Sequence, residues 1–266
     1  MNNKASLETR IPEKPLEIKK YVTIALFIIL IISSGIFTDF SASRLIENAD
    51  QAGDILSQMF LPPDLSYARR LLGPLLETIQ MSIIGTTLGA ILAIPLAIFS
   101  ARNFIENRWV NGFFRNVLGI FRTIPAMALA AIFAAVFGFG SFSGMLALML
   151  FTMGLVAKLG YESIENIDRG AVEALEASGA SKLSILRYAI IPQVLPAFFS
   201  YTLYGFEVNI RAAAVLGYVG AGGIGEYYNR TLSYFKYDRA GTIVIMTFVI
   251  VLLIDLLSSK IREKLV

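Results

Sequence analysis

The sequence predicts an all-α, polytopic membrane protein with six transmembrane helices, and its composition and apolar runs lead to this fold class. Hydrophobic residues make up 56% of the 266 residues, charged residues make up 16%, and the mean hydropathy is +0.65. A soluble domain of this size has about 25% charged residues. Several apolar runs also reach the roughly 17–25 residues that a helix needs to cross a bilayer.

The first span is predicted near the N-terminus, where the apolar run Tyr21–Phe37 follows Lys19 and Lys20. A basic stretch before an apolar run is also typical of a secretory signal peptide. However, this run exceeds the roughly 7–15 apolar residues of such a peptide, and no A-x-A-like cleavage site follows it. We therefore interpret residues 21–38 as an uncleaved membrane anchor, with a cleaved signal peptide as the alternative.

Further apolar runs predict the other five spans. They are Leu75–Phe99, Phe114–Phe139, Phe142–Tyr161, Val194–Val219 and Gly241–Ser259. Proline and glycine inside such helices are tolerated because neighbouring helices satisfy the freed backbone groups. We expect residues 74–259 to form the transmembrane core. Residues 39–73 contain no spanning run, and we expect them outside, either along the membrane surface or as an external helix.

The orientation follows from lysine and arginine, which are enriched in cytoplasmic connections. With six spans, one side receives 15 of these residues and the other side receives 6. The richer side holds both tails, residues 1–20 and 260–266, and the connection 162–192. We therefore expect both termini and this connection in the cytoplasm. The basic balance is explained by topology, so no nucleic-acid partner is expected.

The residue types that are missing exclude several functions. The chain has no cysteine and no histidine, so it has no disulfide, no Cys/His metal site and no imidazole base. No G-x-x-x-x-G-K-[ST] loop for ATP phosphates occurs. We expect no catalytic residue and no bound cofactor. An intramembrane enzyme is disfavoured because no G-x-S-x-G motif or aspartate pair is found, and a secondary transporter is disfavoured because no internal repeat is visible.

The connection 162–192 interrupts the apolar sequence with a pattern of two short helices. Ser178 and Gly179 are typical of a helix end, and Ser181 is a suitable N-cap for the next helix. Pro192 is expected to stop that second helix. Such a hairpin is either a simple connector or an element that docks into a groove of a soluble partner.

This connection resembles the cytoplasmic EAA loop of bacterial ABC importer permeases, which has the pattern E-A-A, three residues, G, nine residues, I-x-L-P. Glu173-Ala174-Leu175, Gly179 and Ala189-Ile190-Ile191-Pro192 stand at those positions, with apolar departures at Leu175, Ala189 and Ile191. In that family the loop is a coupling helix that enters a cleft of an ATP-binding subunit. The resemblance assigns ATPase coupling to Glu173, Ala174, Gly179, Ala180 and Ser181.

Three longer stretches resemble phosphonate-importer permeases: Pro74–Asn103, Phe121–Phe133 and Phe206–Gly225. The resemblance implies a type I ABC importer (MetI-like) core with one extra N-terminal helix, in the bacterial inner membrane. It implies import of a phosphonate, phosphite or phosphate, with a methionine- or taurine-type substrate or a secondary anion transporter as alternatives. The implied partners are two copies of an ABC ATP-binding subunit that binds Mg-ATP, an extracytoplasmic substrate-binding protein, and a second copy of this chain or a paralogue.

The run Gly220–Gly225 formally satisfies the dinucleotide-binding pattern G-x-G-x-x-G. That motif requires a preceding strand, whereas this run follows an apolar helix. We interpret it as an external gate, where glycines allow close packing or hinge movement, and a simple flexible helix end is the alternative. The gate residues are Gly220, Gly222, Gly223 and Gly225.

Polar residues in the predicted spans are candidates for the substrate pathway. Glu207, Asn209 and Arg211 lie in or near the fifth span, and Glu207 and Arg211 are four residues apart, so they share a helix face and can pair. Either they form a structural ion pair or Arg211 lines the pathway. Arg122 is a similar candidate, unless it snorkels to the headgroups. A planar guanidinium matches the oxygens of a phosphorus oxyanion.

Overall fold

The computed structural model of the protein describes residues 18–264, and every regular element in this part of the chain is helical. The predicted tails fall partly outside it, at residues 1–17 and 265–266. The first part of the chain contains α1 (Ile18–Phe37), α2 (Ala42–Glu47), α3 (Ala49–Phe60), η1 (Leu65–Tyr67), α4 (Ala68–Ser100), α5 (Arg108–Thr123) and α6 (Ala126–Phe137). The second contains α7 (Ser141–Glu165), α8 (Gly170–Ala177), α9 (Lys182–Ile185), the π-helical turn η2 (Leu186–Ile190), α10 (Ile191–Leu216), η3 (Gly217–Val219), α11 (Ile224–Ser233) and α12 (Tyr237–Arg262).

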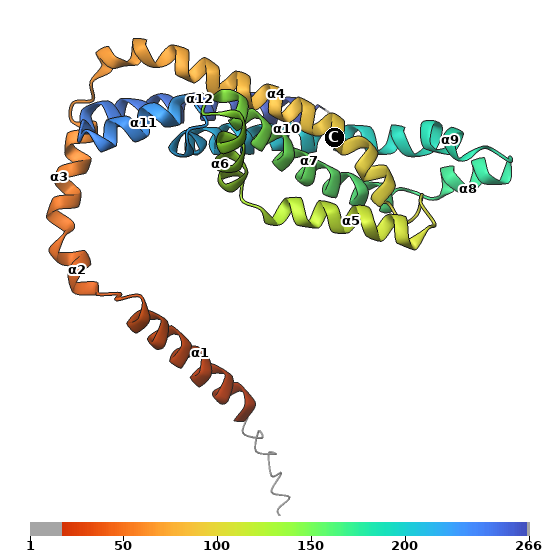
Figure 1. The fold of residues 1–266 in the computed structure, drawn as a ribbon. Coiled ribbons are helices and arrows are strands. Elements are labelled where there is room, and N and C mark those ends of the chain that lie inside the picture. Colours follow the sequence, from red (N-terminus) through yellow and green to blue (C-terminus); the bar gives the residue numbers. More distant parts are fainter. Residues whose placement is uncertain (1–17, 265–266) are drawn as a thin grey trace, which may run out of the picture. The chain divides into compact units, whose positions relative to one another are not determined.

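The chain divides into two units, residues 1–54 and residues 55–266. In the first unit, α1 is an apolar helix of 20 residues with no buried side chain, which suits a helix surrounded by lipid. In the second unit, α4, α7, α10 and α12 run side by side, and α8 and α9 project at one end (Figure 1).

The helices confirm the all-α, multi-pass fold class. Helical stretches long and apolar enough to cross a membrane are Ile18–Phe37, Leu65–Ser100, Ser141–Glu165, Lys182–Val219 and Tyr237–Arg262. A sixth span exists only if α5 and α6 are counted as one.

The prediction of one continuous span over Phe114–Phe139 is wrong. α5 and α6 meet at an angle of 87°. Pro125 is the cause, because its ring disfavours the helical conformation of the residue before it, and Ile124 is extended with ψ 120°. This proline was expected to be tolerated within one helix, whereas it separates two helices.

The junction before α4 is fixed to the start of α12. The Thr242 hydroxyl donates to the Asp64 carbonyl at 2.9 Å, and Arg239 Nε lies 3.3 Å from Asp64 Oδ2. A hydrogen bond from Ser66 and the charge of Arg239 hold the pKa of Asp64 below its usual value. These contacts hold the end of the predicted external segment against α12.

Glycines allow α4 and α7 to pack with their backbones close together. A Cβ atom added at Gly89 would lie 2.5 Å from the Met149 carbonyl oxygen and 2.8 Å from Thr152 Cβ. Small residues at helix interfaces are the main way in which membrane helices associate, since apolar side chains gain little by leaving lipid. The α4–α7 contact is the most extensive in the second unit, and α10 packs on both helices.

Gly89→Ala is expected to destabilise the purified protein in detergent by about 1–3 kcal/mol, because the added methyl group overpacks the α4–α7 contact. Thermal melting measures this effect. Gly119→Ala in α5 is the matched control, since no atom lies within 4 Å of the added Cβ. A helical alanine is favoured there by up to about 1 kcal/mol. Equal melting temperatures for the two variants would contradict the close packing.

Candidate functional sites: an elbow, a glycine loop and charged residues in the spans

The elbow, defined as residues 170–185, consists of α8 and α9 joined at Gly179. The Gly179 N–H donates to the Glu176 carbonyl at 3.0 Å, and the Ala180 N–H donates to the Leu175 carbonyl at 3.0 Å. This pair of bonds is a Schellman motif, which needs a left-handed residue after the helix end. Gly179 supplies it with φ +77°. The predicted bend at Gly179 is thus confirmed.

The predicted stop at Pro192 is wrong. Ser181 caps α9 as expected, since its hydroxyl accepts from the Ser184 N–H at 3.3 Å. The chain then continues through the π-helical turn into α10, with a hydrogen bond from the Ile191 N–H to the Leu186 carbonyl. Such a wider turn relieves the clash that a proline ring makes with the preceding turn of an α-helix. Lys182–Val219 is therefore one continuous helical stretch.

The residues assigned to coupling lie where a partner can reach them. Glu173, Ala174, Gly179 and Ser181 are exposed, and Ala180 is half-buried. Leu183, with 73% of its surface exposed, extends the same elbow with an apolar side chain. Leu183 could not be singled out from the sequence, because a leucine between Lys182 and Ser184 does not show whether it packs against a distant element. An exposed apolar side chain among small ones suits a contact surface.

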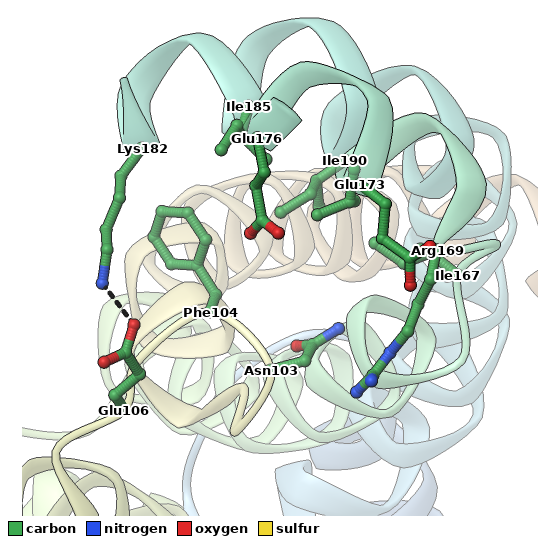
Figure 2. A pocket seen from close by; sticks show the side chains of 11 residues that line it. Asn103, Phe104, Glu106, Ile167, Arg169, Glu173, Glu176, Lys182, Ile185 and Ile190 are labelled. Carbon is green, nitrogen blue, oxygen red and sulfur yellow. Dashed lines mark hydrogen bonds and ion pairs between the residues drawn. The ribbon is translucent and has the colours of Figure 1, made fainter. Parts of the chain in front are cut away.

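A cavity of about 190 Å³ separates the elbow from the α4–α5 connection. Figure 2 shows the Glu173 and Glu176 side chains directed toward it from α8. At its edge, Lys182 Nζ lies 2.8 Å from Glu106 Oε1. The hydrogen bond and the charge of Lys182 lower the pKa of the Glu106 carboxyl. Both side chains are well exposed, so this pair orients the elbow and adds little to stability.

A second polar cluster fixes the α4–α5 connection to α7. Arg115 forms an ion pair with Glu165, and the Arg102 N–H donates to the same Glu165 oxygen at 2.8 Å. The Arg115 guanidinium also lies 4.4 Å from the centre of the Tyr161 ring. These contacts join residues more than 45 positions apart, so no sequence spacing could have indicated them.

The glycine loop, residues 220–223, is closely packed. Gly220, Gly222 and Gly223 have φ between +70° and +80°. The Gly140 N–H donates to the Gly220 carbonyl at 2.8 Å, and the Ile224 N–H donates to Thr78 Oγ1 at 2.9 Å. A Cβ at Gly223 would lie 2.5 Å from that same Thr78 oxygen. The loop therefore rests on α4 and the start of α7, and its opening as a gate stays a prediction.

Gly225 has a different role from the other glycines assigned to the gate. It is the second residue of α11, and a Cβ there would lie 2.9 Å from the Gly217 nitrogen. It therefore lets α11 pack against the end of the α10 stretch. Nearby, the Ser141 hydroxyl donates to the Glu77 carboxylate, which ties α7 to α4 beside the loop.

Asn209 is buried between helices, and its predicted place in the substrate pathway stays a prediction. It has 0% exposed surface, and its amide nitrogen donates to Thr86 Oγ1 at 2.7 Å and Thr152 Oγ1 at 2.6 Å. Thr86 belongs to α4 and Thr152 to α7. The residue predicted for the pathway thus connects α10 to two neighbouring helices.

The predicted ion pair between Glu207 and Arg211 is not formed. Glu207 Oε1 instead accepts from Arg262 Nη2 at 2.8 Å, and Glu207 is only 5% exposed. Arg211 is exposed on α10 and forms no ion pair with any described residue. The carboxylate of Glu207 therefore pairs with an arginine 55 positions away on another helix and not with the arginine four residues away on its own helix.

Arg122 is the other arginine inside a predicted span. It is exposed in the last turn of α5, directly before the break at Pro125. Its stem packs on α7, where a Cβ at Gly154 would lie 3.0 Å from Arg122 Cγ. The structure thus leaves both predicted pathway arginines, Arg122 and Arg211, exposed on the helical unit, while Glu207 and Asn209 are buried.

These observations define a helical, multi-pass membrane component with an exposed elbow between two spans. Residues 93–265 match the family described as "Binding-protein-dependent transport system inner membrane component". The chain belongs to this family. It is therefore an inner-membrane ABC importer permease, a transport component and not an enzyme.

Relatives and solved structures agree with this family. The chain is 37% identical to the phosphite transport system permease protein PtxC of Stutzerimonas stutzeri, over 76% of this chain and 74% of that protein. It is 36% identical to the phosphate-import permease protein PhnE of Mycolicibacterium smegmatis, over 85% of this chain and 42% of that protein. An inward-facing structure of the MetNI methionine ABC transporter has the same fold, with a TM-score of 0.66 and 22% identity over 74% of this chain and 96% of that one.

Gly179→Ala is expected to weaken the elbow by about 1–2 kcal/mol, since a Cβ disfavours the left-handed conformation. Hydrogen exchange at the amides of Gly179 and Ala180 should then accelerate at least fivefold. Gly170→Ala is the matched control, because Gly170 has an ordinary φ and its added Cβ meets its nearest atom at 3.5 Å. Unchanged exchange in Gly179→Ala would contradict the Schellman motif.

Proposed function

We propose that this permease imports a phosphonate or a related phosphorus oxyanion, phosphite or phosphate, with energy from a separate ATPase. The observation that carries the proposal is Arg211, an exposed guanidinium within α10 that no described carboxylate neutralises. An arginine inside a spanning helix is costly, up to about 2.5–3.5 kcal/mol on insertion scales when it stands at the helix centre. Such a charge is retained where it faces a water-filled path or an anion.

The relatives support an anionic substrate. PtxC is named for phosphite and PhnE for phosphate. A guanidinium presents planar donors that match two oxygens of such an anion. Arg122, exposed beside the break between α5 and α6, is a second cation for the same path. A methionine- or taurine-type substrate is the alternative within ABC importers.

The proposed coupling route is one helix. The elbow docks on the ATPase through Glu173, Ala174 and Gly179–Ser181, and the continuous stretch Lys182–Val219 leads from there to the glycine loop. A displacement of the elbow would therefore move Arg211 and the support of the glycine loop together. Two copies of the chain would enclose one path and receive two ATPase subunits, with both termini in the cytoplasm. An extracytoplasmic binding protein would deliver the oxyanion on the glycine-loop side.

Arg211→Gln is expected to lower oxyanion uptake about tenfold, the loss that follows from removing roughly 1.4 kcal/mol of favourable charge interaction. The measurement is ATP-dependent uptake of labelled phosphite, phosphate and methylphosphonate by proteoliposomes that contain the permease, its ATPase and its binding protein. Lys260→Gln is the control, because Lys260 is an exposed cation at the end of α12. ATP-independent uptake driven by an ion gradient would refute the proposal.

Gly179→Trp is expected to abolish co-purification of the ATPase, because the indole blocks insertion of the bend and a side chain strains φ +77°. Membrane insertion should stay intact. Gly119→Trp is the size-matched control, since both glycines have open space around their added Cβ. Retention of the ATPase by Gly179→Trp would show that docking occurs elsewhere.

A further inference from the structure

Four charges of α10 and α12 lie near one another in the second unit. Glu207 is bonded to Arg262, and the other charged groups near its carboxylate are Arg211 and Asp255. Arg262 Nη2 also lies 3.3 Å from Ser259 Oγ, which helps to fix its guanidinium. Glu207 and Arg211 belong to α10, whereas Asp255, Ser259 and Arg262 belong to α12.

Glu207 is within reach of two different arginines. Residues four apart on a helix are neighbours on its surface, so Arg211 can approach the Glu207 carboxylate by a change of rotamer. In the structure Arg211 does not pair with Glu207, and Arg262 Nη2 lies 2.8 Å from Glu207 Oε1. The Glu207 side chain is 5% exposed and that of Arg262 is 30% exposed, so the pair is largely removed from water.

A carboxylate buried to this degree does not stay unpaired. Leaving one partner of a buried ion pair alone costs several kcal/mol, since neither water nor another group compensates its charge. If Arg262 were absent, the cation on the same helix, Arg211, would be drawn to Glu207. The exposed guanidinium would then be neutralised within the protein.

We infer that Arg262 is a positioning residue that occupies Glu207 and thereby keeps Arg211 available to the transported oxyanion. This inference rests on the proposed role of Arg211 in the path. It gives the last turn of α12 a part in substrate passage, although Arg262 itself need not contact the substrate. It also explains why a carboxylate stands one turn from an arginine in an anion transporter without pairing with it.

The test compares two substitutions that break the same ion pair with different consequences. Arg262→Gln leaves the Glu207 carboxylate to pair with Arg211, whereas Glu207→Gln removes that carboxylate. We expect Arg262→Gln to lower the maximal uptake of labelled phosphite, phosphate or methylphosphonate about tenfold, the scale of a charge pair of roughly 1.4 kcal/mol. Glu207→Gln should lower uptake far less. The double variant should recover most of the lost rate.

Control measurements show which carboxylate competes for Arg211 and whether each variant is folded and assembled. Asp255→Asn in the Arg262→Gln background should not restore uptake, because the Glu207 carboxylate is still present one helix turn from Arg211. Co-purification of the ATPase and the melting temperature in detergent report assembly and folding for every variant. Uptake is measured with saturating, substrate-loaded binding protein, so that delivery does not limit the rate.

Two results would overturn the inference about Arg262 and leave the proposed path role of Arg211 intact. If Arg262→Gln and Glu207→Gln reduce uptake equally and the double variant shows no recovery, the ion pair only joins the two helices. If Arg262→Gln has no effect while Arg211→Gln does, Glu207 does not compete for Arg211. If Arg211→Gln takes up the oxyanion at the full rate, both the proposed path role of Arg211 and the inference about Arg262 are overturned.

Discussion

The hydrogen bonds of Asn209 to Thr86 and Thr152 hold the long helical stretch of α10 against α4 and α7. In a bilayer, helices gain little from burying apolar surface against each other, so close backbone packing and polar contacts must join them. Each such bond contributes only about 0.6 kcal/mol on average. Their placement matters more than their strength, because Asn209 lies two residues from both Glu207 and Arg211. The register of α10 relative to its neighbours therefore determines where these charges stand.

The π-helical turn joins α9, the second helix of the elbow, and α10 into one continuous helical stretch. A proline at position 192 within a regular α-helix would clash with the preceding turn and end or kink the helix. The wider turn over Leu186–Ile190 admits it, so the direction set at Gly179 continues into α10. At the other end, η3 leads into the glycine loop. The Gly220 carbonyl in this loop accepts a hydrogen bond from the Gly140 N–H before α7, and the Ile224 N–H that follows the loop donates to Thr78 of α4. A closely packed loop at the end of a stiff helix responds to displacement of that helix as a whole.

Local signals allowed part of this structure to be predicted. Apolar runs marked the spans, and the glycine with its following serine marked the bend, because those features depend on a few adjacent residues. Features that depend on distant residues were not predictable. Pro125 and Pro192 look alike in sequence, but one separates α5 from α6 and the other lies inside a helical stretch. For the site, the elbow was anticipated, whereas the partner of Glu207 was not, since Arg262 is 55 residues away.

The positions of the charged residues in the spans also depend on how α10 packs against its neighbouring helices. An ionisable group in a membrane helix either pairs with another group or faces a water-filled cavity, and Glu207 pairs with Arg262 on another helix. Arg211 stays exposed on the same helical stretch, five residues before the end of α10. An arginine that is already paired with a carboxylate would attract an anion only weakly, and an anion that binds permanently would not be released. In the proposed function, an exposed cation whose local competitor is held by another helix remains available to a passing phosphorus oxyanion.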